Sequence, residues 1–158
     1  MAEKAFLFDS ARCTGCKGCQ IACKMWNSIP SSLEQNANKF NNSYQNPPDL
    51  TGWNRLIMTF NEEAGGSKGV KWAISRRACQ HCTNAGCMSV CPSGALYKDE
   101  ETGLVTYNQE VCIGCQKCAV ACPFDVPRYY NGLDTKIHKC SGCIDRVKHG
   151  LKPACVTT

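Results

Sequence analysis

The spacing of the cysteines constrains this chain more than any other feature. Its 158 residues include 15 cysteines, and these fall into four groups. Groups one and three follow C-x2-C-x2-C-x3-C, group two lengthens the middle gap to four residues, and group four lengthens it to eleven. Such close neighbours can hardly form disulfides with one another, so the pattern indicates metal ligands. The four groups are Cys13, Cys16, Cys19, Cys23; Cys79, Cys82, Cys87, Cys91; Cys112, Cys115, Cys118, Cys122; and Cys140, Cys143, Cys155.

The repeated cysteine triple predicts [4Fe–4S] clusters. Three closely spaced thiolates can surround one cubane, and the fourth cysteine, three residues later in a short helix, binds the other cubane of a pair. A proline directly follows the fourth cysteine of groups two and three, where its fixed φ suits a sharp exit from the site. Gly15, Gly114 and Gly142 precede the second cysteine of their groups and let backbone amides face sulfur. Group two has His81 at that position.

This ferredoxin pattern predicts four clusters in which the groups exchange their last cysteines. We number each cluster by the group that supplies its first three ligands. Complete groups separate their third and fourth cysteines by three residues, so a sixteenth cysteine is due directly after Thr158. Either the chain continues, which we expect, or cluster 1 has three protein ligands. The expected sets are Cys13, Cys16, Cys19 for cluster 1; Cys79, Cys82, Cys87, Cys122 for cluster 2; Cys112, Cys115, Cys118, Cys91 for cluster 3; and Cys140, Cys143, Cys155, Cys23 for cluster 4.

Other uses of cysteine explain the pattern less well. A secreted disulfide scaffold would fit the cysteine content, but the count is odd and MAEKAFLFDS does not read as a signal peptide. Structural zinc needs only two cysteines from each C-x2-C unit and leaves the third without a role. A redox dithiol would explain one C-x2-C unit and not four groups. No apolar run approaches the roughly 18 residues of a membrane span, so we expect no such span and a cytoplasmic location.

The segments around the groups predict an α+β fold: two interleaved two-cluster ferredoxin-like units with short strands, short helices and a long insertion. ALYKD (95–99) and LVTYN (104–108) predict a hairpin, which joins groups two and three into an inner unit, 79–131. Groups one and four form an outer unit, 1–23 plus 132–158. The insertion, 24–78, begins with a polar stretch (27–53) expected at the surface and ends in a hairpin of 55–60 and 70–77. It is either a lid over the clusters or a docking arm for a partner.

Three stretches carry a resemblance to a known family: CTGCKGCQIACKMWN near the start, QNPPDL in the insertion and KCSGCIDRVKHGLKPAC at the end. The chain resembles the iron–sulfur (beta) subunits of molybdenum- and tungsten-pterin oxidoreductases, most of all those of formate dehydrogenases. The long gap in group four is the most specific shared feature, because simple ferredoxins lack it. The small subunits of tungsten aldehyde oxidoreductases and benzoyl-CoA reductases are also similar. Family members continue past a sixteenth cysteine, and some add a membrane helix.

The resemblance implies an electron-transfer subunit that is not an enzyme alone. It would relay single electrons between a large Mo/W-pterin catalytic subunit and a second redox subunit or soluble carrier. We expect no catalytic residue, since the chain has no G-x-G-x-x-G, no P-loop lysine and no nucleophile with an evident base. A free-standing polyferredoxin that serves several enzymes is the alternative, and it would be expected to expose little apolar surface.

The charge of the chain fits bound clusters. The formal charge is +5 with neutral cysteines, and four cubanes at about −2 each bring it to about −3. That balance argues against a nucleic-acid partner. Basic residues beside the groups most simply offset the cluster charge, with docking to an acidic partner as the alternative: Lys17, Lys24, Arg76, Arg77, Lys139, Arg146 and Lys148.

The remaining polar and aromatic residues near the groups have simpler interpretations. His81 is expected either close to a cluster or at the surface, because the complete groups already have four thiols. Trp26, Tyr129 and Tyr130 are expected to serve packing and not electron relay.

Overall fold

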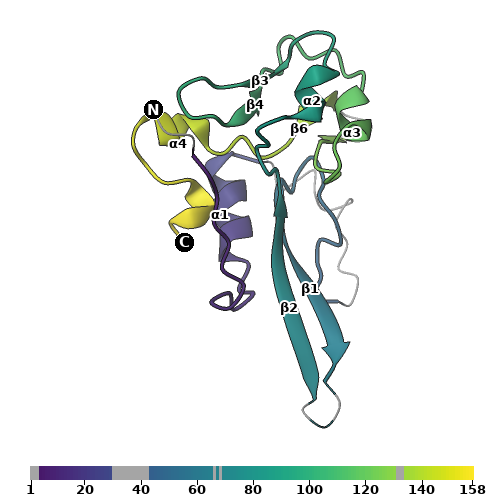
Figure 1. The fold of residues 1–158 in the computed structure, drawn as a ribbon, viewed down its shortest axis with the longest axis vertical. Helices are drawn as coiled ribbons and strands as arrows, with labels where there is room; N and C mark the ends of the chain where they lie inside the picture. Colours follow the sequence, from purple (N-terminus) through teal and green to yellow (C-terminus); the bar gives the residue numbers. More distant parts are fainter. Residues whose placement is uncertain (1–3, 30–42, 66, 68, 131–133) are drawn as a thin grey trace.

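The chain forms short helices and hairpins with long connections. The computed structural model describes residues 4–29, 43–65, 67, 69–130 and 134–158, and Figure 1 shows their arrangement. In order the elements are α1 (Gly18–Trp26), β1 (Leu56–Ala64), β2 (Val70–Ala78), α2 (Gly86–Ser89), β3 (Leu96–Lys98), β4 (Val105–Tyr107), α3 (Lys117–Val120), β5 (Arg128–Tyr130), β6 (Asp134–His138), α4 (Ile144–Lys148) and the 3-10 helix η2 (Ala154–Val156).

Each short α-helix lies within or directly beside a cysteine group. α1 contains Cys19 and Cys23, α2 contains Cys87, and α3 contains Cys118. The predicted short helices are therefore confirmed. α4 begins directly after Cys143, so it occupies the long gap that distinguishes group four.

The turn before the second cysteine has the same conformation in all four groups. Gly15, Gly114 and Gly142 have φ of 69°, 68° and 72°, and His81 adopts φ 49° at the equivalent position. The amides of Gly15, His81 and Gly142 each donate to the sulfur two residues earlier at 3.4 Å. Only the left-handed backbone points these amides at sulfur, which is why glycine is favoured there.

Three antiparallel hairpins link the groups. β1 pairs with β2, beginning with Leu56 opposite Ala78, and β3 pairs with β4, as the sequence predicted. The pairing of β5 with β6 was not predicted, and its register shifts between Arg128 and Tyr130. The boundary expected after residue 131 lies between these two strands, so a hairpin ties the expected inner and outer units together.

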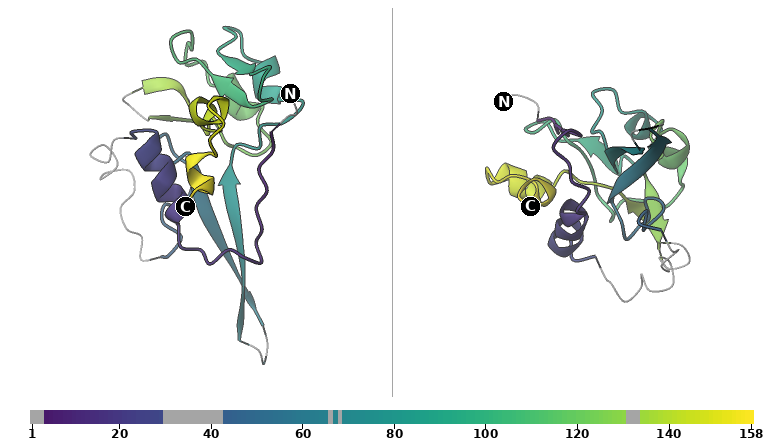
Figure 2. Two further views of the ribbon diagram at one scale, coloured as in Figure 1. Left: turned by 90° about the vertical axis from the view of Figure 1, so that its left-hand side faces the viewer. Right: turned by 90° about the horizontal axis from the view of Figure 1, so that it is seen from below.

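The β1–β2 hairpin projects from the rest of the molecule, as Figures 1 and 2 show. Leu56, Ile57 and Met58 at its base are buried, whereas its outer half is exposed on both strands. Phe60 and Ile74 lie so close to Gly15 that a Cβ there would approach their side chains to 2.6 and 3.2 Å. The middle of the hairpin therefore packs on the loop of group one.

Cysteines are part of the hydrophobic core. One cluster of buried side chains combines Leu56 and Ile57 with Cys23, Cys79 and Cys140. A second cluster is built on Leu96, Val105 and Ile137 around Cys118. The ligands thus replace apolar side chains at the centre of the fold.

The polar half of the insertion differs from its predicted surface position. Residues 30–42 lie outside the described part of the chain. Beyond them, Leu50 and Trp53 are only 3% and 5% exposed. The Leu50 carbonyl accepts a hydrogen bond from Arg128 at 2.9 Å, and the Trp53 ring packs on Tyr130. A few apolar side chains in a polar stretch were enough to bring this segment into the core.

The glycine turns give a stability prediction. Gly114 and Gly94 have similar φ, 68° and 64°, but a Cβ on Gly114 would meet Thr135 Oγ1 at 2.4 Å, whereas a Cβ on Gly94 meets nothing within 4 Å. Gly94→Ala should cost about 1–2 kcal/mol of backbone strain. Gly114→Ala adds a collision beside Cys115, so it should lower the denaturant midpoint further and reduce the bound iron per molecule. Equal losses in both variants would contradict the expected collision.

Candidate metal centres

Two enclosed cavities are lined by cysteines from more than one group. Cys140, Cys143 and Cys155 of group four line one cavity together with Cys23 of group one. The other cavity has four cysteine side chains in its wall: Cys91 of group two with Cys112, Cys115 and Cys118. In each cavity three cysteines of one group face one cysteine of another.

The remaining cysteines gather in two further places. Burial raises the pKa of the Cys87 thiol, and Cys79 and Cys122 are near enough to add to this rise. Cys13 and Cys16 act in the same way on Cys19. Thr158, two residues after η2, lies beside this group and against Gly18. A Cβ added to Gly18 would lie 2.7 Å from Thr158 Cγ2.

The thiols are free, and their electrostatics favour a cationic centre. No disulfide joins any of the 15 cysteines. Burial, together with the nearby Cys140, Cys143 and Cys155, raises the pKa of Cys23 to about 12. Four buried thiols can lose their protons together only if a positive centre holds the thiolates, and metal coordination supplies that charge. The arrangement therefore fits a thiolate-bound [4Fe–4S] cluster. Within the described residues, no three His, Cys, Asp or Glu side chains are placed to hold a single metal ion.

Solvent exposure differs between the groups. Cys16 of group one and Cys115 of group three are exposed. Cys23, Cys79, Cys118, Cys140 and Cys143 are buried. No cysteine of groups two and four is exposed, whereas groups one and three each present one ligand to the surface.

His81 is buried, so the surface alternative for this residue is wrong. Its ring stacks on Phe6 with 5.7 Å between centroids, and neither ring nitrogen has a hydrogen-bond partner among the described residues. Burial, together with the positive charges of Lys139 and Arg76, lowers the pKa of His81 to about 3. The ring is therefore neutral. The sequence signal for this difference was the histidine itself, at the position where the other three groups have glycine.

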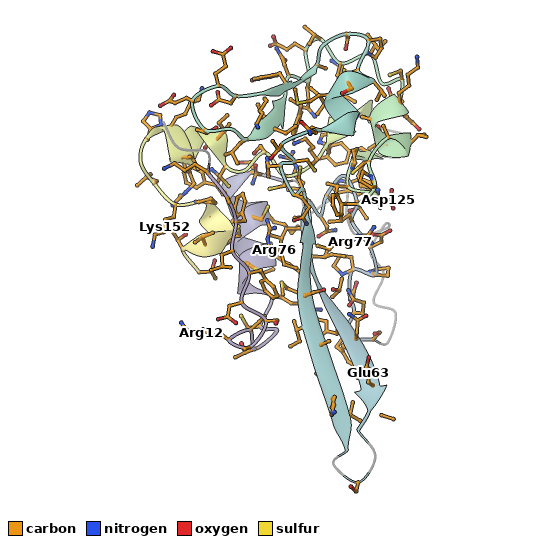
Figure 3. The ribbon with its side chains drawn as sticks, viewed as in Figure 1. Arg12, Glu63, Arg76, Arg77, Asp125 and Lys152 are labelled. Atoms are coloured by element: carbon orange, nitrogen blue, oxygen red, sulfur yellow. The ribbon has the colours of Figure 1, made fainter. Side chains whose placement is uncertain are left out.

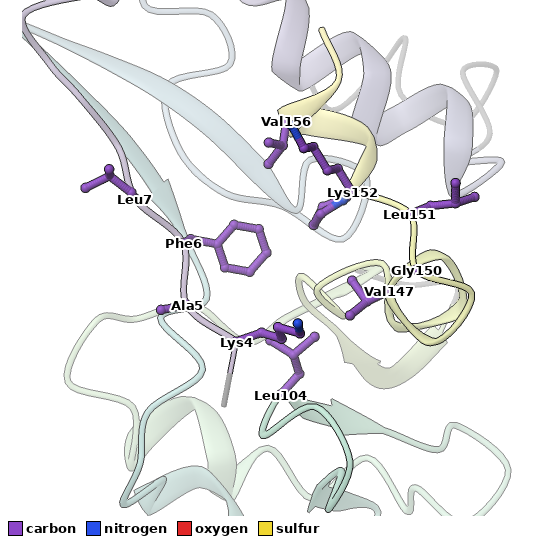
Figure 4. A pocket seen from close by; sticks show the side chains of 11 residues that line it. Lys4, Ala5, Phe6, Leu7, Leu104, Val147, Gly150, Leu151, Lys152 and Val156 are labelled. Carbon is purple, nitrogen blue, oxygen red and sulfur yellow. The ribbon is translucent and has the colours of Figure 1, made fainter. Parts of the chain in front are cut away.

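Two aromatic residues contact the centres in ways that the sequence did not indicate. The Tyr129 hydroxyl lies 3.1 Å from Cys118 Sγ, beyond the packing role expected of it. Phe6 lines the cavity of Cys140 and also a larger pocket of about 390 Å³. Figure 4 shows its ring pointing into this pocket between the N-terminal segment and the turns near Gly150. One aromatic ring thus separates the Cys140 cavity from a surface pocket.

Family comparisons agree with this geometry. Two family models described as "4Fe-4S dicluster domain" match residues 12–95 and residues 70–158. Together they cover all four cysteine groups. The chain therefore carries [4Fe–4S] clusters, as the cysteine spacing predicted.

Individual relatives are subunits of several oxidoreductases. The chain is 40% identical over 156 residues to the formate dehydrogenase-O iron-sulfur subunit of Escherichia coli, covering 99% of this chain and 50% of that protein. It is 39% identical to the formate dehydrogenase 2 subunit beta (cytochrome c-553) of Nitratidesulfovibrio vulgaris, covering 98% of this chain and 72% of that subunit. It is 37% identical to a subunit of the anaerobic dimethyl sulfoxide reductase of Haemophilus influenzae, covering 99% and 69% of the two sequences.

The chain spans about half the length of the Escherichia coli subunits that it matches. None of the helices in the described residues combines the length and apolar character needed to cross a bilayer. The 4Fe-4S dicluster match over residues 70–158 takes in more than half of the chain, and the relative from Nitratidesulfovibrio vulgaris is covered over 72% of its length. The chain therefore belongs to the family of iron–sulfur subunits built from 4Fe-4S dicluster domains.

Proposed function

We propose that this chain relays single electrons between a large Mo/W-pterin catalytic subunit, of the formate dehydrogenase type, and a second redox partner. The observation that carries this proposal is a difference in exposure: Cys16 and Cys115, in two separate groups, are exposed, whereas Cys23, Cys140 and Cys143 of proposed cluster 4 are buried. A bound [4Fe–4S] cluster supplies one-electron chemistry without needing a substrate pocket. An electron relay with two accessible end clusters and a buried middle matches this distribution of cysteine exposure.

Packing supports one order for the four proposed clusters. Cys19 of cluster 1 packs on the core that holds Cys23 and Cys140 of cluster 4, and its charge acts on Cys155 of cluster 4. Cys79 of cluster 2 belongs to this same core, where the charge of Cys140 of cluster 4 acts on it. Cys87, also of cluster 2, packs in the second core. In that second core lie the ligands of cluster 3, among them Cys118, so the order 1–4–2–3 is supported.

The exchange of ligands between groups is part of the proposal. Cys23 in the cavity of group four and Cys91 in the cavity of group three support the predicted sets for clusters 4 and 3. The position of Thr158 beside Gly18 supports a fourth ligand of cluster 1 at the next position of a longer chain. We accordingly propose the outer unit 1–23 plus 132–158, the inner unit 79–131 and the insertion 24–78.

An apolar surface at one end favours a permanent subunit over a diffusing carrier. Val90, Ile113, Val120 and Phe124 are 38%, 66%, 91% and 47% exposed around group three and the neighbouring helix α2. A freely diffusing polyferredoxin would gain nothing from an apolar patch beside its exposed ligand Cys115. A partner that covers the patch would bury it and come close to cluster 3.

Purification and metal analysis test the proposed role. Native anaerobic purification should yield the chain together with a large subunit that contains molybdenum or tungsten. The chain itself should hold about sixteen irons and about sixteen sulfides when all four clusters are present. Isolation of a fully loaded chain that never associates with such a subunit would favour the carrier.

If the groups exchange ligands as proposed, serine variants at ligands of one cluster should give the same spectroscopic signal even when the two cysteines belong to different groups. Loss of one thiolate exposes one iron, and its release should give a [3Fe–4S] signal in electron paramagnetic resonance of the oxidised protein. Cys23→Ser and Cys140→Ser should give the same signal, because both would alter cluster 4. Cys13→Ser should give a different one, from cluster 1. A Cys23→Ser signal identical to that of Cys13→Ser would mean that each group keeps its own cysteines.

A further inference from the structure

Most of the basic residues near the cysteine groups are held by partners other than thiols. These contacts leave their charges directed at carbonyls or carboxylates. They are Lys17 with the Asn46 carbonyl at 3.1 Å, Arg77 with Asp49 at 2.6 Å, Arg146 with the Lys152 carbonyl at 2.7 Å, and Lys148 with Asp99 at 2.6 Å. Lys139 and Arg76 differ from these four: Lys139 also contacts a cysteine sulfur, and Arg76 has a buried nitrogen without a hydrogen-bond partner among the described residues, as does Arg55 in the wall of the Cys23 cavity.

Lys139 lies between cysteines assigned to two different clusters. The residue is 1% exposed. Its Nζ atom is 3.7 Å from Cys79 Sγ and 3.0 Å from the carbonyl of Cys140, with the Val105 carbonyl at 2.5 Å. Cys79 belongs to proposed cluster 2 and Cys140 to proposed cluster 4. A buried ammonium needs compensating negative charge, and bound thiolates would provide it.

Arg76 occupies the equivalent place between clusters 4 and 1. It lies on β2, where Figure 3 labels it. Its guanidinium lies over the Phe6 ring at 5.0 Å, and Phe6 lines the cavity of Cys155 and Cys140. Its Nη2 atom is buried without a hydrogen-bond partner among the described residues. The charge of Arg76 acts on Cys155 and on Cys19, which lie in the packed elements η2 and α1.

We propose that Lys139 and Arg76 are intercluster cations, each of which stabilises the added electron on the two clusters that it separates. The proposal rests on the cluster assignment given above. Each electron adds one negative charge to a cluster, and neighbouring clusters repel each other's electrons through a low-dielectric interior. A positive side chain at the junction offsets that repulsion for both neighbours. Cluster 4 lies at both junctions and therefore depends on both cations.

Removing either charge should disfavour reduction of two specific clusters. Lys139→Met keeps most of the side-chain volume and should lower the midpoint potentials of clusters 2 and 4. Arg76→Gln should lower those of clusters 4 and 1. A hydrogen bond to a charged group implies an effect of about tenfold in the ratio of reduced to oxidised cluster at a fixed solution potential. Cluster 3 should keep its potential in both variants.

The measurement is a redox titration followed by electron paramagnetic resonance on the anaerobically prepared protein. The serine variants described above identify the signals of clusters 1 and 4. Arg12→Gln is the matched control, because Arg12 adjoins Cys13 but its side chain is 89% exposed and pairs with Asp9. Water should screen its charge, so its loss should leave all potentials unchanged. Arg76→Lys should restore most of the reduced fraction lost in Arg76→Gln.

The outcomes separate this proposal from the proposed function. Fully loaded Lys139→Met and Arg76→Gln proteins with unchanged potentials would overturn the intercluster role and leave the relay intact. Equal shifts in all clusters, or a matching shift in Arg12→Gln, would overturn it as well. If the Lys139→Met protein loses iron, the Arg76→Gln protein provides the test of the intercluster role. Arg76 is only partly buried, so its replacement should disturb the fold less. Failure of the proposed function would appear instead as a fully loaded unmodified chain that never associates with a subunit containing molybdenum or tungsten.

Discussion

The fold depends on thiols from distant segments meeting in shared cavities. Cys23 and Cys140 are separated by most of the chain, yet they line one cavity and belong to one core. Burial and mutual repulsion raise the pKa of such thiols, so the assembled site favours neutral cysteines until iron binds. Iron binding and folding are therefore linked, because the charge that makes the site stable also closes the contacts between segments.

In this arrangement the hairpins support the cysteine sites. Phe60 and Ile74 of the β1–β2 hairpin pack on the Gly15 turn, and Tyr129 of β5 reaches Cys118 Sγ. An isolated two-stranded hairpin is marginally stable in water, so the base of β1–β2 needs Leu56 and Ile57 in the cysteine-rich core. The outer half, exposed on both strands, extends beyond this support and is available to a partner.

The sequence predicted those features that follow from short-range rules. Cysteine spacing predicted [4Fe–4S] clusters, which the family models confirm, and alternating apolar residues around EETG predicted the β3–β4 hairpin. The β5–β6 hairpin escaped prediction because RYY and DTKIH have too few residues to display a period. Leu50 and Trp53 were misplaced because their polar neighbours dominate the composition of the segment, whereas burial depends on individual side chains. Lys139 could not be distinguished from other basic residues, since its contacts come from remote strands.

His81 shows how the middle of the relay differs from its ends. The His81 ring packs beside Gly142, since a Cβ added to Gly142 would lie 3.3 Å from His81 Cε1. The same ring stacks on Phe6. Burial keeps the ring neutral, so it fills the junction without adding a third positive charge beside Lys139 and Arg76. A dry, filled junction lowers the local dielectric, and the same cation then acts more strongly than it could in water. Cluster 3, at the exposed end that carries Cys115, needs no such cation, because water itself can solvate the added charge there.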